Sequence, residues 1–301
     1  MTEITLFELK QLAKNLGIDK ISAVKLKKLP EITEKFRKWL SLGYNGTMFF
    51  LNNNIEKRED PSLLLSNANT VIVVMQPYPA NIKFTGELKM AKYALEEDYH
   101  ISLKNKLNDL VEILEMKFGG NYYIGVDSSP IFEKDWAVIS GLGWRGKNSL
   151  IINKDYGSYF NIGIIISDLN VVVEADSCIK EIATQCGSCN LCKTNCPTNA
   201  ILDNYTIDAR KCISYLTVEA KLSEDILLKK EIANSKYIFG CDVCQDVCPY
   251  NKKFINNNLK NIYITKEELY KLSNKNFNEK FAKSAVLRLR NNRLRRNLDN
   301  L

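Results

Sequence analysis

The chain has 301 residues, enough for about two domains and a sizeable core. Its 42 lysines and arginines exceed its 35 aspartates and glutamates, and the resulting charge of +7 permits an anionic partner without requiring one. No apolar run approaches the ~18 residues that a membrane-spanning helix needs, and the first residues lack the pattern of a secretory signal. We therefore expect a cytoplasmic monomer.

Helical and strand-like segments alternate along the first 170 residues. Gly17 is placed to end a first helix, and Pro77 and Pro79 are placed to stop a buried strand. The predicted helices span 5–16 and 98–118, and the predicted strands span 20–24, 70–75, 122–126 and 160–167. This alternation predicts an α/β domain.

Two groups of cysteines follow, and each ends in Cys-Pro. Cys186 opens a C-x2-C-x2-C-x3-C-P run, which is the ligand spacing of bacterial ferredoxins. Cys212 stands alone, and Cys241 opens a C-x2-C-x3-C-P group. A disulfide framework belongs to short secreted chains. Zinc also suits C-x2-C pairs, but overlapping pairs with Cys-Pro endings favour two [4Fe–4S] clusters.

The two clusters are expected to share their ligands in a crossed pattern, because the fourth cysteine of such a run binds the neighbouring cluster. One cluster would be held by Cys186, Cys189, Cys192 and Cys248. The other would be held by Cys196, Cys212, Cys241 and Cys244. The remaining cysteine, Cys178, is expected to be an ordinary buried or linker thiol.

Three regions are predicted: an α/β domain over 1–175, a ferredoxin-like two-cluster domain over 176–256, and a short helical tail over 257–301. A polar, acidic stretch at 174–177 marks the first boundary. In the tail, Thr265 begins a capping-box pattern. The tail also carries a run of arginines at Arg288, Arg290, Arg293, Arg295 and Arg296. Such a run is typical of a solvated helix face, and it is a phosphate-contact candidate if the partner is a nucleic acid.

Two further motifs are weaker. Residues 141–146 match G-x-G-x-x-G, but the segment before them is predicted to be helical, so a dinucleotide fold is not expected. His100 is the single histidine, which excludes a multi-histidine metal site. Asp98-x-His100 begins a D-x-H-x-x-G pattern of some cobalamin enzymes, but Leu103 replaces the glycine, so no histidine ligand to cobalt is expected. Whether His100 is structural or functional stays open.

The order of these motifs resembles the epoxyqueuosine reductases, cobalamin-dependent iron–sulfur enzymes of tRNA modification. The matching segments are 58–61, 91–100, 126–133, 141–148, 157–159 and 210–217, together with both cysteine groups. The resemblance implies reduction of epoxyqueuosine to queuosine at the wobble position of tRNAs for aspartate, asparagine, histidine and tyrosine. Two electrons and two protons would convert the epoxide to an alkene and water. The clusters would pass electrons singly from an external donor to cobalamin.

The resemblance also implies roles for single residues. Asp127 matches the family's proton donor, which is needed because an alkoxide is a poor leaving group. Its apolar neighbours predict a raised pKa that keeps Asp127 protonated. The implied cobalamin contacts are Arg58, Tyr93, Asp127, Lys147, Asn148 and Ser214. The arginine run of the tail becomes the candidate for tRNA contacts.

Two departures from the family pattern accompany the match. Lys134 follows Glu133 where many members have arginine, which puts a bidentate role of that arginine in doubt. Longer members carry C-terminal helical repeats that this chain lacks, so we expect a smaller tRNA footprint. Two other functions stay open: a reductive dehalogenase-like cobalamin iron–sulfur reductase of a small molecule, and a ferredoxin-type electron carrier. The carrier would leave the α/β domain unexplained.

Overall fold

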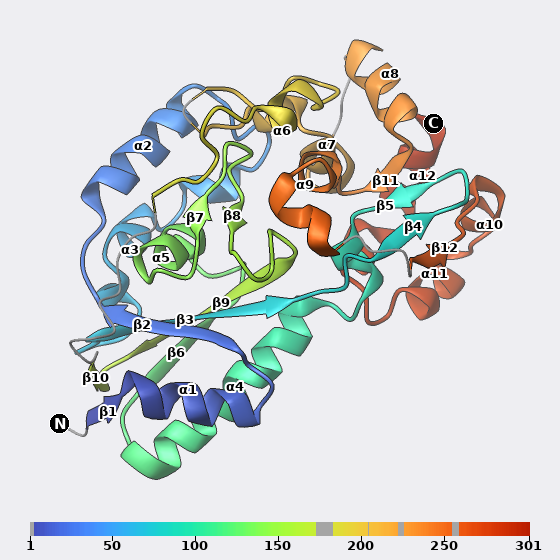
Figure 1. Cartoon of the computed structure of the whole chain (residues 1–301). Coiled ribbons are helices and arrows are strands. Elements are labelled where there is room, and N and C mark those ends of the chain that lie inside the picture. The colour runs from blue at the N-terminus through green and yellow to red at the C-terminus, as the bar shows by residue number, and fades with distance from the viewer. Residues whose placement is uncertain (1–2, 173–182, 204, 222–225, 255–258) are drawn as a thin grey trace.

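The computed structural model describes residues 3–172, 183–203, 205–221, 226–254 and 259–301 (Figure 1). Cys178, the acidic stretch at 174–177 and the predicted boundaries at 175/176 and 256/257 lie outside these residues. The division into three regions therefore stays a prediction. Among the described residues, no helix is both long enough and apolar enough to cross a bilayer.

A four-stranded antiparallel sheet forms the centre of the N-terminal half. Its strands lie in the order β2 (Lys20–Lys25), β3 (Thr70–Pro77), β9 (Phe160–Ser167) and β6 (Tyr122–Gly125). All four were predicted from the sequence, with ends that differ by two residues or fewer. The predicted combination of helices and strands is present, and the antiparallel pairing makes it the α+β form of that class.

Both faces of this sheet are covered, which explains the unbroken apolar run of β3. Ile72 and Val74 pack on one face with α1 (Leu6–Asn15) and α4 (Tyr99–Phe118). Val71 and Val73 pack on the other face with residues of α5, which spans Glu133–Ile139. Successive residues of a strand point to opposite faces, so a strand buried on both sides has no polar position. Figure 1 shows α1 and α4 below the sheet and α5 above it.

The helices begin and end where local signals place them. A capping box between Thr5 and Glu8 starts α1, and the chain turns at Gly17 with a φ of +69°. The Asp98 side chain accepts a hydrogen bond at the start of α4. The remaining N-terminal elements are α2 (Pro30–Ser41), α3 (Ile55–Glu59) and the parallel pair β1 (Glu3–Thr5) and β10 (Asn170–Val172).

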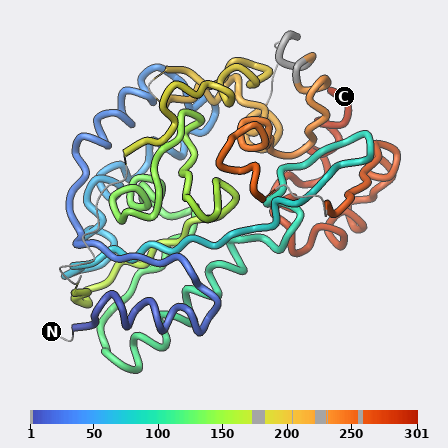
Figure 2. Tube along the Cα trace, viewed as in Figure 1, coloured from blue at the N-terminus to red at the C-terminus, as the bar shows by residue number. Residues whose placement is uncertain are grey.

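A second core joins distant parts of the chain (Figure 2). Strand β5 (Lys89–Met90) pairs with β11 (Tyr237–Phe239), and β4 (Ile82–Phe84) pairs with β12 (Lys260–Ile262). Apolar side chains of α10 (Lys266–Tyr270), α11 (Asn274–Lys280) and α12 (Arg290–Asp299) fill this core. Residues 82–95 of the first predicted region thus fold with the C-terminal part.

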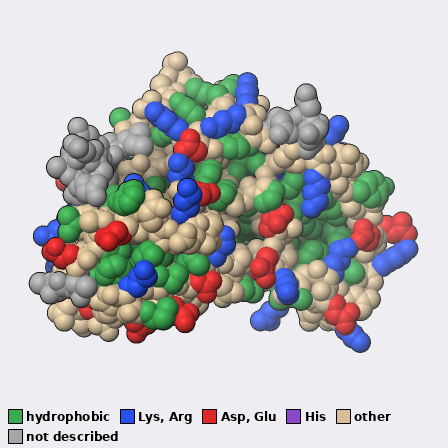
Figure 3. Space-filling model, turned by 60° about the horizontal axis from the view of Figure 1, so that its bottom comes forward, with side chains coloured by type: hydrophobic (Ala, Val, Ile, Leu, Met, Phe, Trp, Pro, Cys, Tyr) green, Lys and Arg blue, Asp and Glu red, His purple; other side chains and the backbone are tan. Residues whose placement is uncertain are grey.

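The remaining elements surround the cysteines. They are the hairpin of β7 (Trp144–Arg145) and β8 (Ile151–Ile152) and the helices α6 (Leu191–Thr194), α7 (Ile213–Val218), α8 (Ile226–Ser235) and α9 (Val243–Asp246). The G-x-G-x-x-G segment follows α5 and contains β7, so its helix-to-strand order is the reverse of that of a dinucleotide site. On the face turned forward in Figure 3, basic and acidic side chains are interspersed.

Candidate active site and cluster-binding loops

The four cysteines predicted to hold one cluster line a single cavity. Its volume is about 230 Å³, and Cys186, Cys189, Cys192 and Cys248 share its wall with Ile152, Pro249 and Tyr250. Trp144 packs behind it, fully buried, with its ring centroid 4.8 Å from that of Tyr250. Three cysteines of the first run and the last cysteine of the second thus face the same space.

The other four cysteines lie within electrostatic range of one another. Burial raises the pKa of Cys241, and the charges of Cys212 and Cys196 add to this rise. Burial also raises the pKa of Cys244, with contributions from Cys241 and Cys212. Cys192 of the first group acts on Cys244 too, so the two sets are neighbours. The thiolate is the form that binds a metal, so the iron of a cluster would offset the negative charge that burial disfavours here.

Lys147 and Asn148, two of the predicted cobalamin contacts, hold the cysteine loops. The Lys147 ammonium donates to the carbonyls of Gly187 and Cys189 at 2.8 and 2.9 Å and to Asn190 Oδ1 at 3.0 Å. The buried Asn148 amide donates to the carbonyl of Cys244 at 3.5 Å. All three donors of the ammonium are therefore used within the protein.

Asp127 lies at the end of a chain of three charged side chains. His100 Nε2 is 3.0 Å from Asp127 Oδ2, and His100 Nδ1 is 2.7 Å from Asp98 Oδ1. A neutral imidazole has one N–H, whereas an imidazolium has two. A carboxylate on each side therefore favours the imidazolium. Consistently, the hydrogen bond to Asp127 raises the pKa of His100.

The backbone of Asp127 is held as firmly as its side chain. Its φ is +57°, a conformation that residues other than glycine rarely adopt. Its amide donates to Glu133 Oε1 at 2.5 Å. Glu133 begins α5, which packs on the central sheet, so the sheet fixes the position of the Asp127 turn.

The protonation of these carboxyl groups differs from the sequence-based expectation. Partial desolvation raises the pKa of Asp127, but hydrogen bonds from His100 and Tyr99 outweigh it and hold the pKa below its usual value. The Asp127 side chain is 47% exposed, so burial does not keep it protonated. Desolvation and the Asp127 charge instead raise the pKa of Glu133 to about 8. The prediction of a burial-protonated Asp127 is therefore wrong in its physical reason.

Arg58 and Tyr93 lie near this turn, and both retain capacity for a ligand. Arg58 Nε is buried without a hydrogen-bond partner among the described residues, and its NH1 reaches only the carbonyl of Ile131 at 3.5 Å. The Tyr93 ring packs 6.0 Å from Tyr99, centroid to centroid. Burial raises the pKa of Tyr93, which keeps its phenol neutral.

Ser214 adjoins the second set of cysteines. It lies in the first turn of α7, and its backbone N–H donates to the Cys212 thiol. Burial raises the pKa of Cys212, and the charge of Lys134 opposes that rise. Lys134 also lies within electrostatic range of Asp127 and Glu133. The Asp127 turn and Cys212 therefore both lie within electrostatic range of the same lysine.

The five arginines of the tail divide into two kinds. Arg293 donates to the carbonyl of Val218 at 3.1 Å, and Arg296 donates to those of Leu216 and Ala220 at 3.2 and 2.5 Å. These carbonyls lie at the C-terminal end of α7, where cations are stabilising.

The other three arginines are exposed. Arg288 pairs with Glu219 at 2.7 Å, and Arg295 donates to the carbonyl of Leu272 at 3.0 Å. Arg290 makes no side-chain hydrogen bond or ion pair to any described residue.

Comparison with known proteins identifies the family. An epoxyqueuosine reductase from Cyclobacterium marinum is 37% identical over 298 residues, covering 96% of this chain and 94% of its own. The chain belongs to the epoxyqueuosine reductase family. The family model described as epoxyqueuosine reductase QueG, DUF1730 matches residues 58–128. A 4Fe-4S double cluster binding domain matches residues 185–251, which supports iron–sulfur clusters rather than zinc in this segment.

Other epoxyqueuosine reductases extend the comparison. The Escherichia coli relative is 37% identical over 81% of this chain and 65% of its own. The structure of the epoxyqueuosine reductase from Streptococcus thermophilus superposes with a TM-score of 0.84 at 29% identity, covering 98% of this chain and 80% of that one. An epoxyqueuosine reductase with an epoxyqueuosine-modified tRNA-Tyr stem loop gives the same TM-score at 27% identity and the same coverage. As a member of this family, the protein is an oxidoreductase.

Sequence reasoning left His100 undecided and gave Glu133 no chemistry. One signal was available: Asp98 begins the predicted helix 98–118 and lies two residues before His100, so an N-cap aspartate could orient that ring. The contact between His100 and Asp127 joins residues 27 apart in sequence. No local pattern predicts it.

Proposed function

We propose that the protein reduces the epoxide of epoxyqueuosine in tRNA to the alkene of queuosine, with cobalamin and two [4Fe–4S] clusters. The observation that carries this proposal is that the two matched family models cover Asp127, within residues 58–128, and all eight predicted cluster cysteines, within residues 185–251. A proton donor and an electron source must meet at one substrate for this reaction. The family assignment favours this function over a carrier or a small-molecule reductase.

The residues around Asp127 fit a large polar cofactor. Arg58 has a buried N–H without a partner among the described residues, and such a group is costly unless a ligand accepts from it. Arg58, Tyr93, Asn148 and Ser214 are the proposed cobalamin contacts. Lys147 stays in this set only by the family resemblance, because its donors hold the Cys186 loop. Bound cobalamin would supply low-potential electrons to a substrate carbon.

The Asp98–His100–Asp127 chain supplies the proton in this proposal. Asp98 orients the ring through Nδ1, so Nε2 faces Asp127. The imidazolium and the carboxylate hold one proton between them, and Asp127 would pass it to the epoxide oxygen as the ring opens. His100, whose side chain is 28% exposed, would then take a second proton from solvent. The pair would pass this proton to the same oxygen, so that the oxygen leaves as water.

Electrons would enter through the cluster of Cys186, Cys189, Cys192 and Cys248. The loop that carries Cys186 is exposed at Gln185, Gly187 and Ser188, so an external donor can approach it. The charge of Cys192 acts on Cys244, and the charge of Lys134 acts on Cys212, so the second set of cysteines lies within electrostatic range of both the first set and Lys134. We propose that it relays single electrons to the cofactor.

The tRNA would be bound partly by the arginines of the tail. Arg288, Arg290 and Arg295 are exposed, and Arg290 is the best candidate for a phosphate contact because its guanidinium is not engaged elsewhere among the described residues. Arg293 and Arg296 stay in the proposed set, although both also hold α7.

The test is mass spectrometry of tRNA nucleosides from a host that lacks its own epoxyqueuosine reductase, with cobalamin supplied. Expression of the wild type should convert epoxyqueuosine to queuosine. Asp127→Asn should lose turnover by about 10²–10⁴-fold, the usual contribution of general acid catalysis, with clusters and bound cobalamin retained. Asp109→Asn, the same change on the exposed face of α4, is the matched control.

Persistent epoxyqueuosine with both clusters and cobalamin bound would refute the proposed substrate and favour a small-molecule reductase. The same result without bound cobalamin would favour an electron carrier. Wild-type turnover by Asp127→Asn would remove Asp127 from the mechanism.

A further inference from the structure

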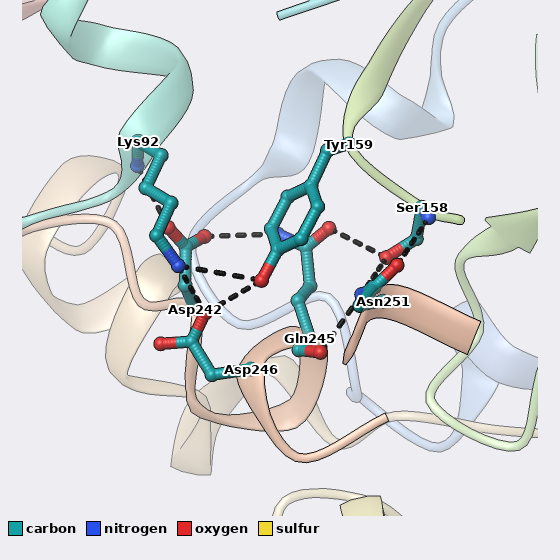
Figure 4. Close-up of polar contacts among 7 residues, drawn as sticks. All are labelled: Lys92, Ser158, Tyr159, Asp242, Gln245, Asp246 and Asn251. Atoms are coloured by element: carbon teal, nitrogen blue, oxygen red, sulfur yellow. Dashed lines mark hydrogen bonds and ion pairs between the residues drawn. The ribbon is translucent and has the colours of Figure 1, made fainter. Parts of the chain in front are cut away.

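A buried lysine next to the second set of cysteines has no part in the function proposed so far. The side chain of Lys92 is 5% exposed, and its ammonium forms an ion pair with Asp246 and lies 3.3 Å from the Tyr159 hydroxyl. Tyr159 donates to the same carboxylate at 2.6 Å. Figure 4 shows the ammonium directed at these two groups. A charge at this depth is retained only when it is paired.

The backbone of Lys92 is bound to the same segment. Its N–H donates to Asp242 Oδ2 at 2.7 Å, and Gln245 Nε2 donates to Asp242 Oδ1 at 2.8 Å. Both oxygens of this 1%-exposed side chain therefore accept hydrogen bonds, and neither is left unpaired by burial. The network contains two carboxylates and one ammonium.

The network continues into the N-terminal half of the chain. Ser158 Oγ donates to Gln245 Oε1 at 2.8 Å, and Asn251 Nδ2 donates to Ser158 Oγ at 2.9 Å (Figure 4). These contacts join the segment 242–251, which lies among the cysteines, to residues that adjoin the central sheet. The surroundings hold Lys92 in place, so its charge stays at a fixed distance from the cysteines.

The position of Lys92 follows from the pairing of β5 with β11. The Ala91 N–H donates to the carbonyl of Phe239 at 2.7 Å, and Gly240 then turns the chain into Cys241. Lys92 thus lies beside the start of the second cysteine group, and Tyr93, a proposed cobalamin contact, follows it. The charge of Asp242 acts on the thiols of Cys241 and Cys244, and the charge of Lys92 acts on Asp242.

We propose that Lys92 is a positioning residue for electron transfer, whose buried ammonium offsets the Asp242 and Asp246 carboxylates and thereby raises the reduction potential of the cluster held by Cys196, Cys212, Cys241 and Cys244. Reduction of a [4Fe–4S] cluster by one electron adds one negative charge and moves no proton. A nearby fixed cation favours the added electron, and a nearby anion opposes it. The inference rests on the ligand set in the proposed function.

The test is a redox titration of the reconstituted two-cluster protein, followed by electron paramagnetic resonance with dithionite as reductant. It needs neither tRNA nor cobalamin, so it does not depend on turnover. Lys92→Met should move the reduction wave of one cluster, the one held by the second set of cysteines, to a more negative potential. The wave of the other cluster should move by a smaller amount. Asp246→Asn should move the same wave in the positive direction. The double variant Lys92→Met/Asp246→Asn should return it toward the wild-type value.

Lys89→Met is the matched control, because it removes the same charge from β5 at a half-buried position beside Tyr237. It should leave both waves in place. Unchanged waves in Lys92→Met with full iron content would overturn the proposal, as would shifts of the same sign in Lys92→Met and Asp246→Asn. If Lys92→Met loses its clusters, the proposal is tested by Asp246→Asn alone. A reduction wave of Asp246→Asn that stays in place or becomes more negative would then overturn the proposal. Absence of a second wave in the wild type would instead refute the ligand set.

Discussion

Asp127 and His100 illustrate how a site can keep a proton available near neutral pH without a buried acid. The expectation from sequence was a carboxyl group protonated by its apolar neighbours. In the structure, the side chain of Asp127 is half exposed and the proton belongs to the pair, because His100 lies between two carboxylates. Glu133 is the carboxyl group whose pKa is raised, to about 8, and it holds the Asp127 backbone.

The pair predicts a pH dependence of stability. Asp127 raises the pKa of His100 in the folded protein. The contribution of His100 to the free energy of unfolding is therefore fully present below pH about 6.5, the pKa of histidine in the unfolded chain, and is lost as the pH rises through the folded pKa. The pKa of Asp127 is lowered in the folded protein, so the contribution of Asp127 to the free energy of unfolding is lost as the pH falls through its folded pKa. His100→Gln should therefore lower the melting temperature most between these two limits.

The measurement is thermal unfolding of the wild type and His100→Gln across pH. The difference should shrink at alkaline pH, where the imidazole is neutral in both folded and unfolded wild type. A difference that stays constant from acid to alkaline pH would show that the ring acts through packing alone.

At the scale of elements, the pairing of β5 with β11 brings Lys92 and Tyr93 beside Cys241. Gly240 makes this close approach possible. Its φ is +66°, and a Cβ at this position would lie 2.5 Å from Ala91 Cβ. Any side chain here would push the two strands apart.

Gly240→Ala should therefore lower both the melting temperature and the iron content. We expect a loss of about 1–3 kcal/mol from crowding, with a further cost of about 1 kcal/mol from the left-handed backbone. Gly17→Ala is the control, because Gly17 has a φ of +69° and the added Cβ would meet only the flexible end of the Lys106 side chain, at 3.8 Å. It should show the backbone cost alone and keep its iron. Equal losses in the two variants would contradict the close approach.

Helix α12 presents arginines with two different tasks. Arg296→Ala removes donors from the carbonyls of Leu216 and Ala220 and should cost about 1.5–3 kcal/mol of stability, the range for hydrogen bonds to charged groups. Arg290→Ala should leave stability unchanged and should reduce the salt dependence of tRNA binding by about one phosphate contact. Chemical denaturation and binding titrations at several salt concentrations measure the two effects. An unchanged salt slope in Arg290→Ala would assign that side chain to the solvated surface.

On the scale of the whole molecule, two cysteine groups separated by some fifty residues converge, and cysteines of both groups line one cavity. The crossed ligand sets predict which cysteine substitutions resemble each other. Cys248→Ser and Cys189→Ser should impair the same cluster, and Cys196→Ser should impair the other, although Cys196 and Cys189 share one run. Each variant should retain about half of the iron.

Iron analysis with electron paramagnetic resonance of the reduced variants checks this prediction. Cys248→Ser and Cys189→Ser should lose the same signal. If Cys189→Ser and Cys196→Ser instead lose the same signal, each run holds its own cluster and the crossed pattern is wrong.

Sequence alone determined the features that depend on short spacing. The cysteine runs, the cap at Thr5, the buried strand β3 and the beginning of α4 are each specified within a few residues, and the structure contains the predicted strands and helices. The family resemblance drawn from ordered motifs is confirmed by relatives that match most of the chain. Local patterns have this power because helix capping, strand burial and ligand spacing involve neighbours along the chain.

Only the tertiary structure decided which distant groups share a charge or a proton. Lys92 pairs with Asp246, 154 residues away. His100, in the first turn of α4, contacts Asp127, 27 residues away. Arg293 and Arg296, predicted from their run as a solvated face or phosphate contacts, bind the end of α7. The cause is common to all three. The sequence around a charged side chain does not specify its partner. Folding removes water from the charge, and the partner is then the group that the fold places beside it.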